Sequence, residues 1–296
     1  MSTATTAAPG TRPAPRRPSF AWLGVVPFFL FSLLFLFLPI SYLVIGSFQT
    51  TSGEPTLGNY GRLGTEIVLQ AYQNSLLISA ITAIGGGSFG FLLAWAVILG
   101  GLPRALRTAL TTFSGVASNF AGVPLALAFV FTIGNNGLLT NLILQATDVR
   151  ITDHFSLYTI WGIALVYLYF QFPLMVLVIA PAIDGLRREW REAAENMGAT
   201  PADYWRRVAL PILMPSILGT VILLFGNAFG AQATAFQLTG GTIPVASVLI
   251  GAQIRGDVLR DPGLGYALAM GMVAIMGVTI AVYVWLQRRS ERWLRS

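Results

Sequence analysis

The sequence predicts an all-α integral membrane protein with six transmembrane helices. Of its 296 residues, 55% are hydrophobic and only 10% are charged, whereas about 25% of the residues of a soluble domain are charged. All Asp, Glu and Arg residues lie outside six uncharged intervals, and each interval is long enough for the roughly 20 apolar residues that cross a bilayer. The arginines are also divided unequally between the segments that join these intervals.

The intervals predict six crossings, with both termini on the same side of the membrane. They are residues 18–53, 67–103, 108–147, 154–183, 208–254 and 262–287. We expect the spans themselves at 20–48, 71–99, 108–133, 157–182, 212–236 and 263–286, with a kink near Pro39 and a break or bend near Pro124. Residues 1–19, rich in Pro, Ala, Thr and Arg, are typical of a disordered tail. Residues 70–290 then hold a core of five spans.

The basic residues predict that both termini are cytoplasmic. All 18 are Arg. The inner segments of this topology carry Arg12, Arg16, Arg17, Arg104, Arg107, Arg187, Arg188, Arg191, Arg206, Arg207, Arg288, Arg289, Arg292 and Arg295, and the outer segments carry Arg62, Arg150, Arg255 and Arg260. Cytoplasmic loops of membrane proteins carry such an excess. Because the arginines flank spans and form no continuous patch, we expect no nucleic-acid partner.

Small residues four positions apart occur in two spans, as Gly86 with Gly90 and as Gly226 with Gly230. Such pairs allow helices to approach closely in a membrane. Packing within the subunit is the favoured interpretation, and a dimer seam is the alternative.

The cytoplasmic segment 184–211 is predicted to form two helices. Residues 186–197 are good helix formers, and Gly198 suits the left-handed position just past a helix end. Thr200 is expected to cap a second helix that has Pro201 at its first position and runs to Leu210. Ala193, Ala194 and Met197 should form a shallow apolar patch edged by Arg191, Glu192 and Glu195. The physical pattern leaves open a docking surface for a soluble partner and a spacer on the membrane surface.

A family resemblance favours the docking surface. The segment contains Glu192-Ala193-Ala194, then Gly198 after three residues, Val208 after nine more, and Leu210-Pro211 after one more. This pattern resembles the EAA loop of permease subunits of binding-protein-dependent (type I) ABC importers, with Val208 at the position of the family's usual Ile. The loop follows the fourth of six spans, as in the family, and the resemblance extends over roughly residues 70–290.

The resemblance implies the type I ABC importer permease fold, a place in the cytoplasmic membrane of a bacterium, and a coupling role for this loop. It implies contact with a cytoplasmic ATPase through Glu192, Ala193, Ala194, Met197, Gly198, Leu210 and Pro211. It also implies two ATPase subunits, a second permease subunit that is a homologous but different chain, and an extracytoplasmic substrate-binding protein. The segments Thr239-Gly240-Gly241 and Asp261-Pro262-Gly263-Leu264-Gly265 resemble the permeases for polyamines, phosphonates, ferric ions and thiamine, and we favour a polyamine as cargo.

The chain itself is expected to be a non-catalytic subunit. A Walker A loop needs a Lys at the phosphates, and the sequence contains none. ATP is therefore expected to be used by the partner subunits, with no cofactor bound by this chain. The sequence has no Cys and a single His, His154, which is expected to be an ordinary loop residue, so no metal site is predicted.

A solute path needs polar or aromatic side chains within the spans. The candidates are Asn119, Tyr167, Gln171, Asn227, Gln232 and Thr234. In a continuous fifth span, Asn227 and Thr234 are seven residues apart and share one face, while Gln232 lies on another. An interhelical hydrogen bond is the simpler role for each of these side chains.

The main alternative is an ion-coupled secondary transporter. Proton-driven carriers typically use Asp, Glu or His inside the membrane, and the predicted spans contain no ionisable residue of these types. A sodium-coupled carrier that binds its ion through backbone carbonyls stays open. An intramembrane enzyme is disfavoured, since it would need a buried nucleophile and base or a metal set.

Overall fold

The computed structural model describes residues 24–255 and 260–294. Within these ranges the regular elements are helices, with one isolated bridge between Gln49 and Pro55. Six of the described helices are long and apolar enough to cross a membrane, which confirms the predicted all-α membrane fold. The chain divides into two compact units, Met1–Ile45 and Gly46–Ser296. The predicted tail 1–19 lies outside the described residues.

A π-turn precedes a proline in two of the membrane helices. α1 (Val26–Ser32) continues through the π-turn Leu33–Phe37 into α2 (Leu38–Ser47), and the N–H of Leu38 bonds to the carbonyl of Leu33. Pro39 follows directly. Proline lacks an N–H, and its ring clashes with the carbonyl four residues back. Widening the preceding turn by one residue lets the helix continue through it.

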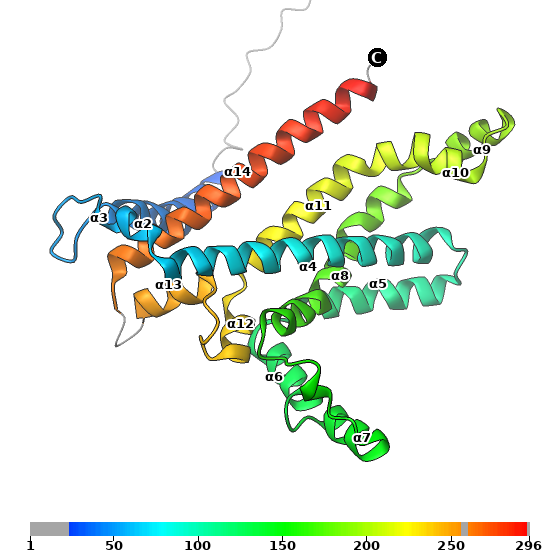
Figure 1. Ribbon diagram of the computed structural model, residues 1–296. Coiled ribbons are helices and arrows are strands. Elements are labelled where there is room, and N and C mark those ends of the chain that lie inside the picture. Colours follow the sequence, from blue (N-terminus) through cyan, green and yellow to red (C-terminus); the bar gives the residue numbers. More distant parts are fainter. Residues whose placement is uncertain (1–23, 256–259, 295–296) are drawn as a thin grey trace, which may run out of the picture. The chain divides into compact units, whose positions relative to one another are not determined.

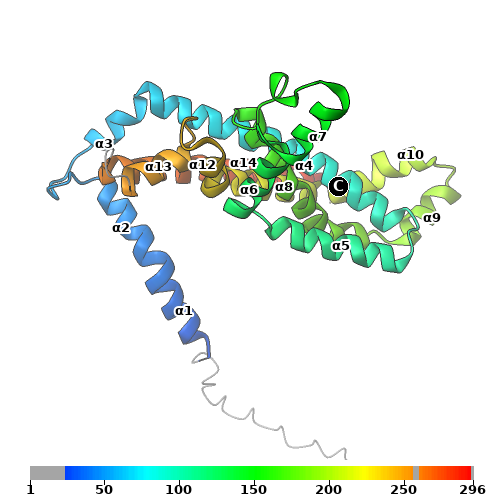
Figure 2. The ribbon, with the colours of Figure 1, turned by 90° about the horizontal axis from the view of Figure 1, so that it is seen from below.

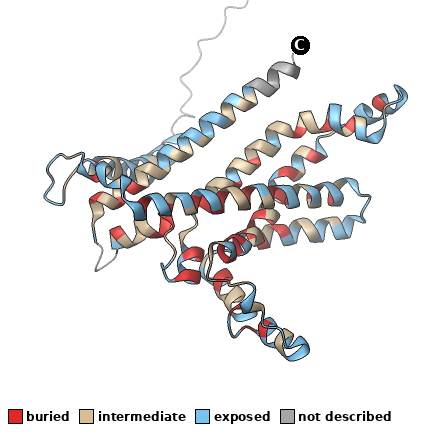
Figure 3. Cartoon of the chain, viewed as in Figure 1, coloured by how far each residue is buried: buried red, intermediate tan, exposed pale blue. Residues whose placement is uncertain are grey.

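The second unit is built around α4 (Glu66–Leu99) and α8 (Ile160–Asp184), which pack against each other along much of their length (Figure 1). α4 ends in a tight turn, and α5 (Arg104–Asn119) runs back along α8. α11 (Leu210–Gly230) packs on α4 and α8, and α14 (Pro262–Leu294) packs on α11. Buried residues lie along α4 and α8 (Figure 3).

Glycines permit the close packing of α4 on α8. A Cβ atom at Gly86 would lie 2.6 Å from the Cβ atom of Gln171, and one at Gly90 would lie 2.5 Å from the Cβ atom of Met175. These distances are far below van der Waals contact, so neither position has room for a side chain. Both glycines therefore serve packing within the subunit, which is the interpretation that the sequence favoured.

The predicted third span, 108–133, consists of two helices. α5 ends at Asn119, and α6 (Gly122–Ile133) begins after a break at 120–121, before Pro124. Gly122 has a φ of +73°, which favours glycine. By length and apolar composition the third membrane candidate is 122–147, which joins α6 to α7 (Leu138–Thr147). The helix α5 is not part of it, because it has only 16 residues and contains several Thr and Ser.

The predicted fifth span, 212–236, is also divided. α11 ends at Gly230, and α12 (Gln232–Thr239) begins after Ala231, which has an extended backbone. A further helix, α13 (Ala246–Arg255), precedes α14. The expectation of a continuous fifth span was therefore wrong.

Two views show which segments of the second unit share an end (Figures 1 and 2). The turn between α4 and α5, α9 (Arg188–Asn196), α10 (Pro201–Tyr204) and the C-terminal part of α14 lie toward one end. α3 (Gly58–Gly61) and α13 lie toward the other. The segments at the first end are those with the most arginines.

Candidate functional site: the α9–α10 loop and a cavity between helix breaks

The loop between α8 and α11 contains two capped helices, as predicted. α9 ends at Asn196, and Gly198 has a φ of +80°. The Thr200 hydroxyl accepts a hydrogen bond from the backbone N–H of Asp203 at 3.2 Å, and the Asp203 carboxylate accepts one from the N–H of Thr200 at 3.3 Å. This reciprocal capping box, with Pro201 at the first helical position, fixes the start of α10.

The second helix of the loop does not end at Leu210. α10 passes through the π-turn Trp205–Ala209 into α11. The N–H of Leu210 bonds to the carbonyl of Trp205, so the widened turn lies directly before Pro211 and removes the reason for a stop. Leu210 and Pro211 are half-buried at the start of α11, and a movement of the loop would reach the membrane helix through them.

Ala194 lies inside the loop and not on the predicted apolar patch. It is only 5% exposed and packs in a cluster with Tyr204 and Ala209. α9 can approach the second helix this closely because alanine carries a single methyl group. The prediction that Ala194 is part of an exposed patch was wrong, since the short helix turns this position toward its neighbour.

The exposed face of α9 carries Glu192 and Ala193, with Met197 just past the helix end. Met197 is 82% exposed. Glu192 is paired with Arg188 at 2.8 Å. A Cβ atom added at Gly198 would meet nothing within 4 Å, so this glycine is needed for its backbone angle and not for close packing within the chain. The exposed face thus combines small and flexible apolar groups with charges at its edge.

A cavity of about 500 Å³ lies where the two helix breaks meet. Four of the six predicted path residues line it: Asn119, Asn227, Gln232 and Thr234. They come from the end of α5, from α11 and from the start of α12. At the breaks the N–H of Gly122 bonds to the Thr234 hydroxyl and the carbonyl of Ala231 to the Tyr167 hydroxyl, so side chains satisfy backbone groups that the interrupted helices leave unpaired, as broken membrane helices require.

Tyr167 and Gln171 have structural roles beside the cavity. The Tyr167 hydroxyl donates a hydrogen bond to the carbonyl of Ala231, in the α11–α12 break. The Gln171 amide donates to the carbonyl of Leu224 at 2.9 Å. Both side chains are at most 1% exposed. Each therefore makes the interhelical bond that the sequence left as the simpler role.

The break between α11 and α12 also shows that Asn227 and Thr234 do not share one face of a continuous fifth span, as was predicted. Asn227 belongs to α11, whereas Thr234 belongs to α12, and the seven-residue spacing has no meaning across a break. They still border the same cavity, because tertiary packing brings the two helices to it.

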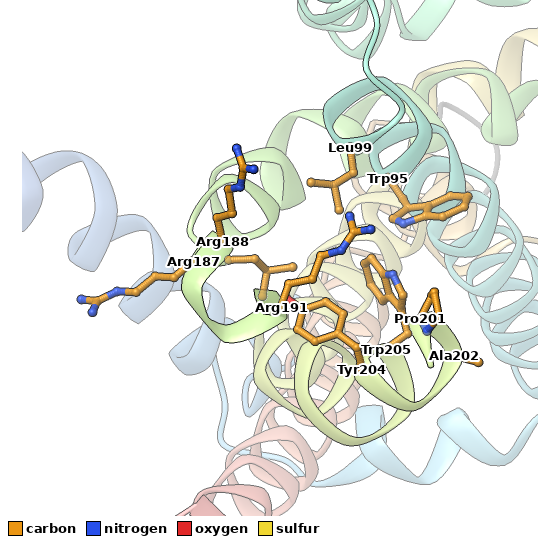
Figure 4. A pocket seen from close by; sticks show the side chains of 10 residues that line it. Trp95, Leu99, Arg187, Arg188, Arg191, Pro201, Ala202, Tyr204 and Trp205 are labelled. Carbon is orange, nitrogen blue, oxygen red and sulfur yellow. The ribbon is translucent and has the colours of Figure 1, made fainter. Parts of the chain in front are cut away.

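A second pocket, of about 530 Å³, was not predicted (Figure 4). It lies between the end of α4 and the α9–α10 loop. It is lined by Trp95, Leu99, Leu186, Arg187, Arg188, Arg191, Pro201, Ala202, Tyr204 and Trp205. The clustered arginines and aromatic residues of segment 187–205 were a usable signal, but the contribution of α4 depends on the fold.

Among the described residues, no group of three or more Asp, Glu or His side chains could hold a metal ion.

Comparison with known proteins gives consistent matches. The family of binding-protein-dependent transport system inner membrane components matches residues 86–296. The sulfate transport system permease protein CysT of Salmonella typhimurium is 31% identical over 71% of this chain and 72% of its own length. The spermidine/putrescine transport system permease protein PotB of Escherichia coli is 26% identical over 85% of this chain and 92% of its own.

The fold has a counterpart among solved structures. A chain of a bacterial ABC transporter involved in the import of the acidic polysaccharide alginate superimposes with a TM-score of 0.72, at 18% identity, over 91% of this chain and 95% of that one. This structure confirms the fold, and the family match and the permease relatives confirm the resemblance to type I importer permeases. Since the relatives are permease subunits, the chain is a non-catalytic, multi-pass protein of the bacterial inner membrane. It belongs to the inner membrane components of binding-protein-dependent transport systems, the permease subunits of ABC importers.

Proposed function

We propose that this chain forms a solute path through the membrane and is driven by ATPase subunits that dock on the α9–α10 loop. The observation that carries the proposal is the build of this loop. Its interior is packed around Ala194, whereas Ala193 on α9 and Met197 just past the end of α9 are exposed. A capping box fixes the start of the next helix, α10. A rigid helix with a small apolar face is suited to a cleft on a soluble partner, and the continuous helix into α11 would carry its movement to the cavity.

The assembly that we propose has two cytoplasmic ATPases, a second, homologous permease chain and an extracytoplasmic binding protein. Both termini are cytoplasmic in this proposal. Support comes from the arginine-rich segments, which include the α4–α5 turn and the α9–α10 loop and lie toward one end of the second unit (Figure 1). Positive charge of this kind is retained on the cytoplasmic side.

The test is recovery of the ATPase with tagged permease purified from its host in a mild detergent. Ala193→Trp should remove most of the ATPase while the permease elutes at an unchanged volume. Ala105→Trp is the matched control, because Ala105 is exposed on α5 near the same end but is not part of the loop. Equal recovery of the ATPase with both variants would contradict the docking surface.

The cargo has two candidates. The polyamine expected from the sequence is supported by the similarity to PotB. An oxyanion such as sulfate is supported by the similarity to CysT and by the cavity lining, whose described residues offer amides and hydroxyls and no carboxylate that would attract a polycation. Of the two candidates, we propose an oxyanion as the cargo. Uptake of labelled sulfate and of labelled spermidine should be compared in cells with and without the gene. A loss of uptake confined to spermidine would favour the polyamine over the oxyanion.

A further inference from the structure

The pocket between α4 and the α9–α10 loop has a charged rim and an apolar wall (Figure 4). Arg187, Arg188 and Arg191 supply the charge, and Trp95 and Leu99 come from the last turn and a half of α4. Among its described lining residues there is no Asp or Glu. The pocket is therefore suited to an anion that also has an apolar part.

The arginines keep donors for such an anion. Arg188 and Arg191 each bond to a glutamate one turn further along α9, through Nε, at 2.8 Å. A guanidinium has five N–H donors, so each terminal Nη group can bind a second partner. In Figure 4 the Arg191 side chain reaches across the pocket toward Leu99 and Trp95, whereas Arg187 and Arg188 extend outward from the rim.

The apolar wall lies where a membrane boundary is expected. The Trp95 and Trp205 rings meet edge to face with centroids 5.9 Å apart, and the long apolar helix α4 ends at Leu99. Tryptophan is enriched at the level of lipid head groups. Basic pockets between membrane helices on the cytoplasmic side bind phosphate-bearing head groups. A free anion would use only the arginines, whereas a lipid would use both the charged rim and the wall.

We propose that this pocket binds the phosphate group of an anionic phospholipid. Arg191 contacts the phosphate, and Trp95 and Leu99 contact the first part of the acyl chains. The bound lipid joins α4 to the α9–α10 loop and so holds the loop at the membrane surface. The site depends on the proposed cytoplasmic position of the loop, but not on the ATPase contact.

The experiment measures phosphatidylglycerol bound to the purified full-length chain in detergent, by native mass spectrometry, together with the Tm. Phosphatidylglycerol should bind and raise the Tm, and phosphatidylcholine should do neither to the same extent. Arg191→Gln should weaken binding about fivefold, the effect of one basic residue near an anionic surface. Trp95→Leu should weaken it as well. Arg206→Gln is the control, since Arg206 is exposed in the same loop and does not line the pocket.

Three results would overturn the proposal. Equal losses in Arg191→Gln and Arg206→Gln would mean that only the overall charge matters. An equal rise in Tm with inorganic phosphate, abolished by Arg191→Gln, would overturn the lipid as the source and leave a free phosphate. A chain that binds no phosphatidylglycerol, but loses the ATPase in Arg191→Gln, would make the pocket a partner contact. If Arg191→Gln lowers the Tm even without lipid, that variant no longer reports on binding alone. Phosphatidylglycerol binding to Trp95→Leu is then the test, and unchanged binding in that variant would overturn the proposal.

Discussion

The hydroxyl of Thr234 accepts a hydrogen bond from the backbone N–H of Gly122 at 3.0 Å and lies 3.3 Å from the carbonyl oxygen of the same residue. The two residues are 112 positions apart, each in the first turn of a helix that follows a break. Thr234 is only 2% exposed. The α5–α6 and α11–α12 breaks are therefore built against each other, and the cavity between them depends on this contact.

Thr234→Val should lower the stability of the protein and its transport activity. Valine keeps the shape of the side chain but leaves the part-buried Gly122 N–H without its partner, a loss of about 1 kcal/mol. The measurements are the Tm in detergent and solute uptake in the host. Thr132→Val is the control, because the Thr132 hydroxyl is exposed and bonds only within its own helix. Equal effects of the two variants would contradict the cross-link.

Gly90→Ala should loosen the packing of α4 on α8. The added methyl group would lie 2.5 Å from the Cβ atom of Met175, and such overpacking typically costs about 1–3 kcal/mol. Gly277→Ala in α14 is the matched control, since a Cβ atom there meets nothing within 4 Å and alanine favours the helix by about 1 kcal/mol. The Tm of the first variant should fall and that of the second should hold or rise. A fall in both would show that packing at Gly90 is not the cause.

The sequence was sufficient for features that local chemistry determines. The six crossings follow from uncharged intervals, and the loop follows from Gly198, Thr200 and Pro201, whose backbone angles and caps the structure confirms. The capping signals act within a few residues of the chain, and each crossing follows from a single uncharged interval. These features could be predicted without knowing the tertiary contacts of the chain.

The helix breaks and the orientation of α9 could not be predicted in the same way. No proline marks the break at Ala231, and the carbonyl freed there is bonded by Tyr167, 64 positions earlier in the chain. Likewise, a helix as short as α9 does not reveal from its sequence whether Ala193 or Ala194 faces its neighbour. Such features arise from tertiary contacts, which can override local preference.

Asp261 should give the protein an acid-sensitive stability. Its carboxylate accepts a hydrogen bond from Arg62 at 2.5 Å, which joins the η3 turn (Arg62–Gly64) to the start of α14. This bond, more than the bond from the Leu264 N–H, holds the pKa of Asp261 below its ordinary value. A lowered pKa stabilises the folded state above the unfolded pKa of about 3.9, and the stabilisation is lost as the pH falls through the folded pKa.

The measurement is the Tm between pH 7 and pH 3. Asp261→Asn should lower the Tm at pH 7 and reduce its fall in acid, and Arg62→Gln should act in the same direction. The side chain of Arg62 is 44% exposed and that of Asp261 is 30% exposed. Solvent screening therefore limits the contribution of this ion pair to stability to less than about 1 kcal/mol. Parallel curves for the wild type and Asp261→Asn would show that this pair does not contribute.

Neighbouring alanines of α9 should separate the folding of the loop from its docking. Ala194→Leu adds three carbons to a position that is 5% exposed and packed on Tyr204 and Ala209, and overpacking of this kind costs about 1–3 kcal/mol. Ala193→Leu adds the same atoms to the exposed face. The Tm of the purified chain should fall only for Ala194→Leu, whereas recovery of the ATPase should fall for both.

The Tm and the recovery of the ATPase together distinguish a lost docking surface from a misfolded loop. A variant that loses the partner at an unchanged Tm has lost a contact surface, and a variant that loses both has lost the loop itself. If Ala193→Leu lowered the Tm as much as Ala194→Leu, the exposed face would be part of the chain's own packing. The docking surface would then have to lie elsewhere, because Met197 alone offers too little apolar area to hold a soluble subunit.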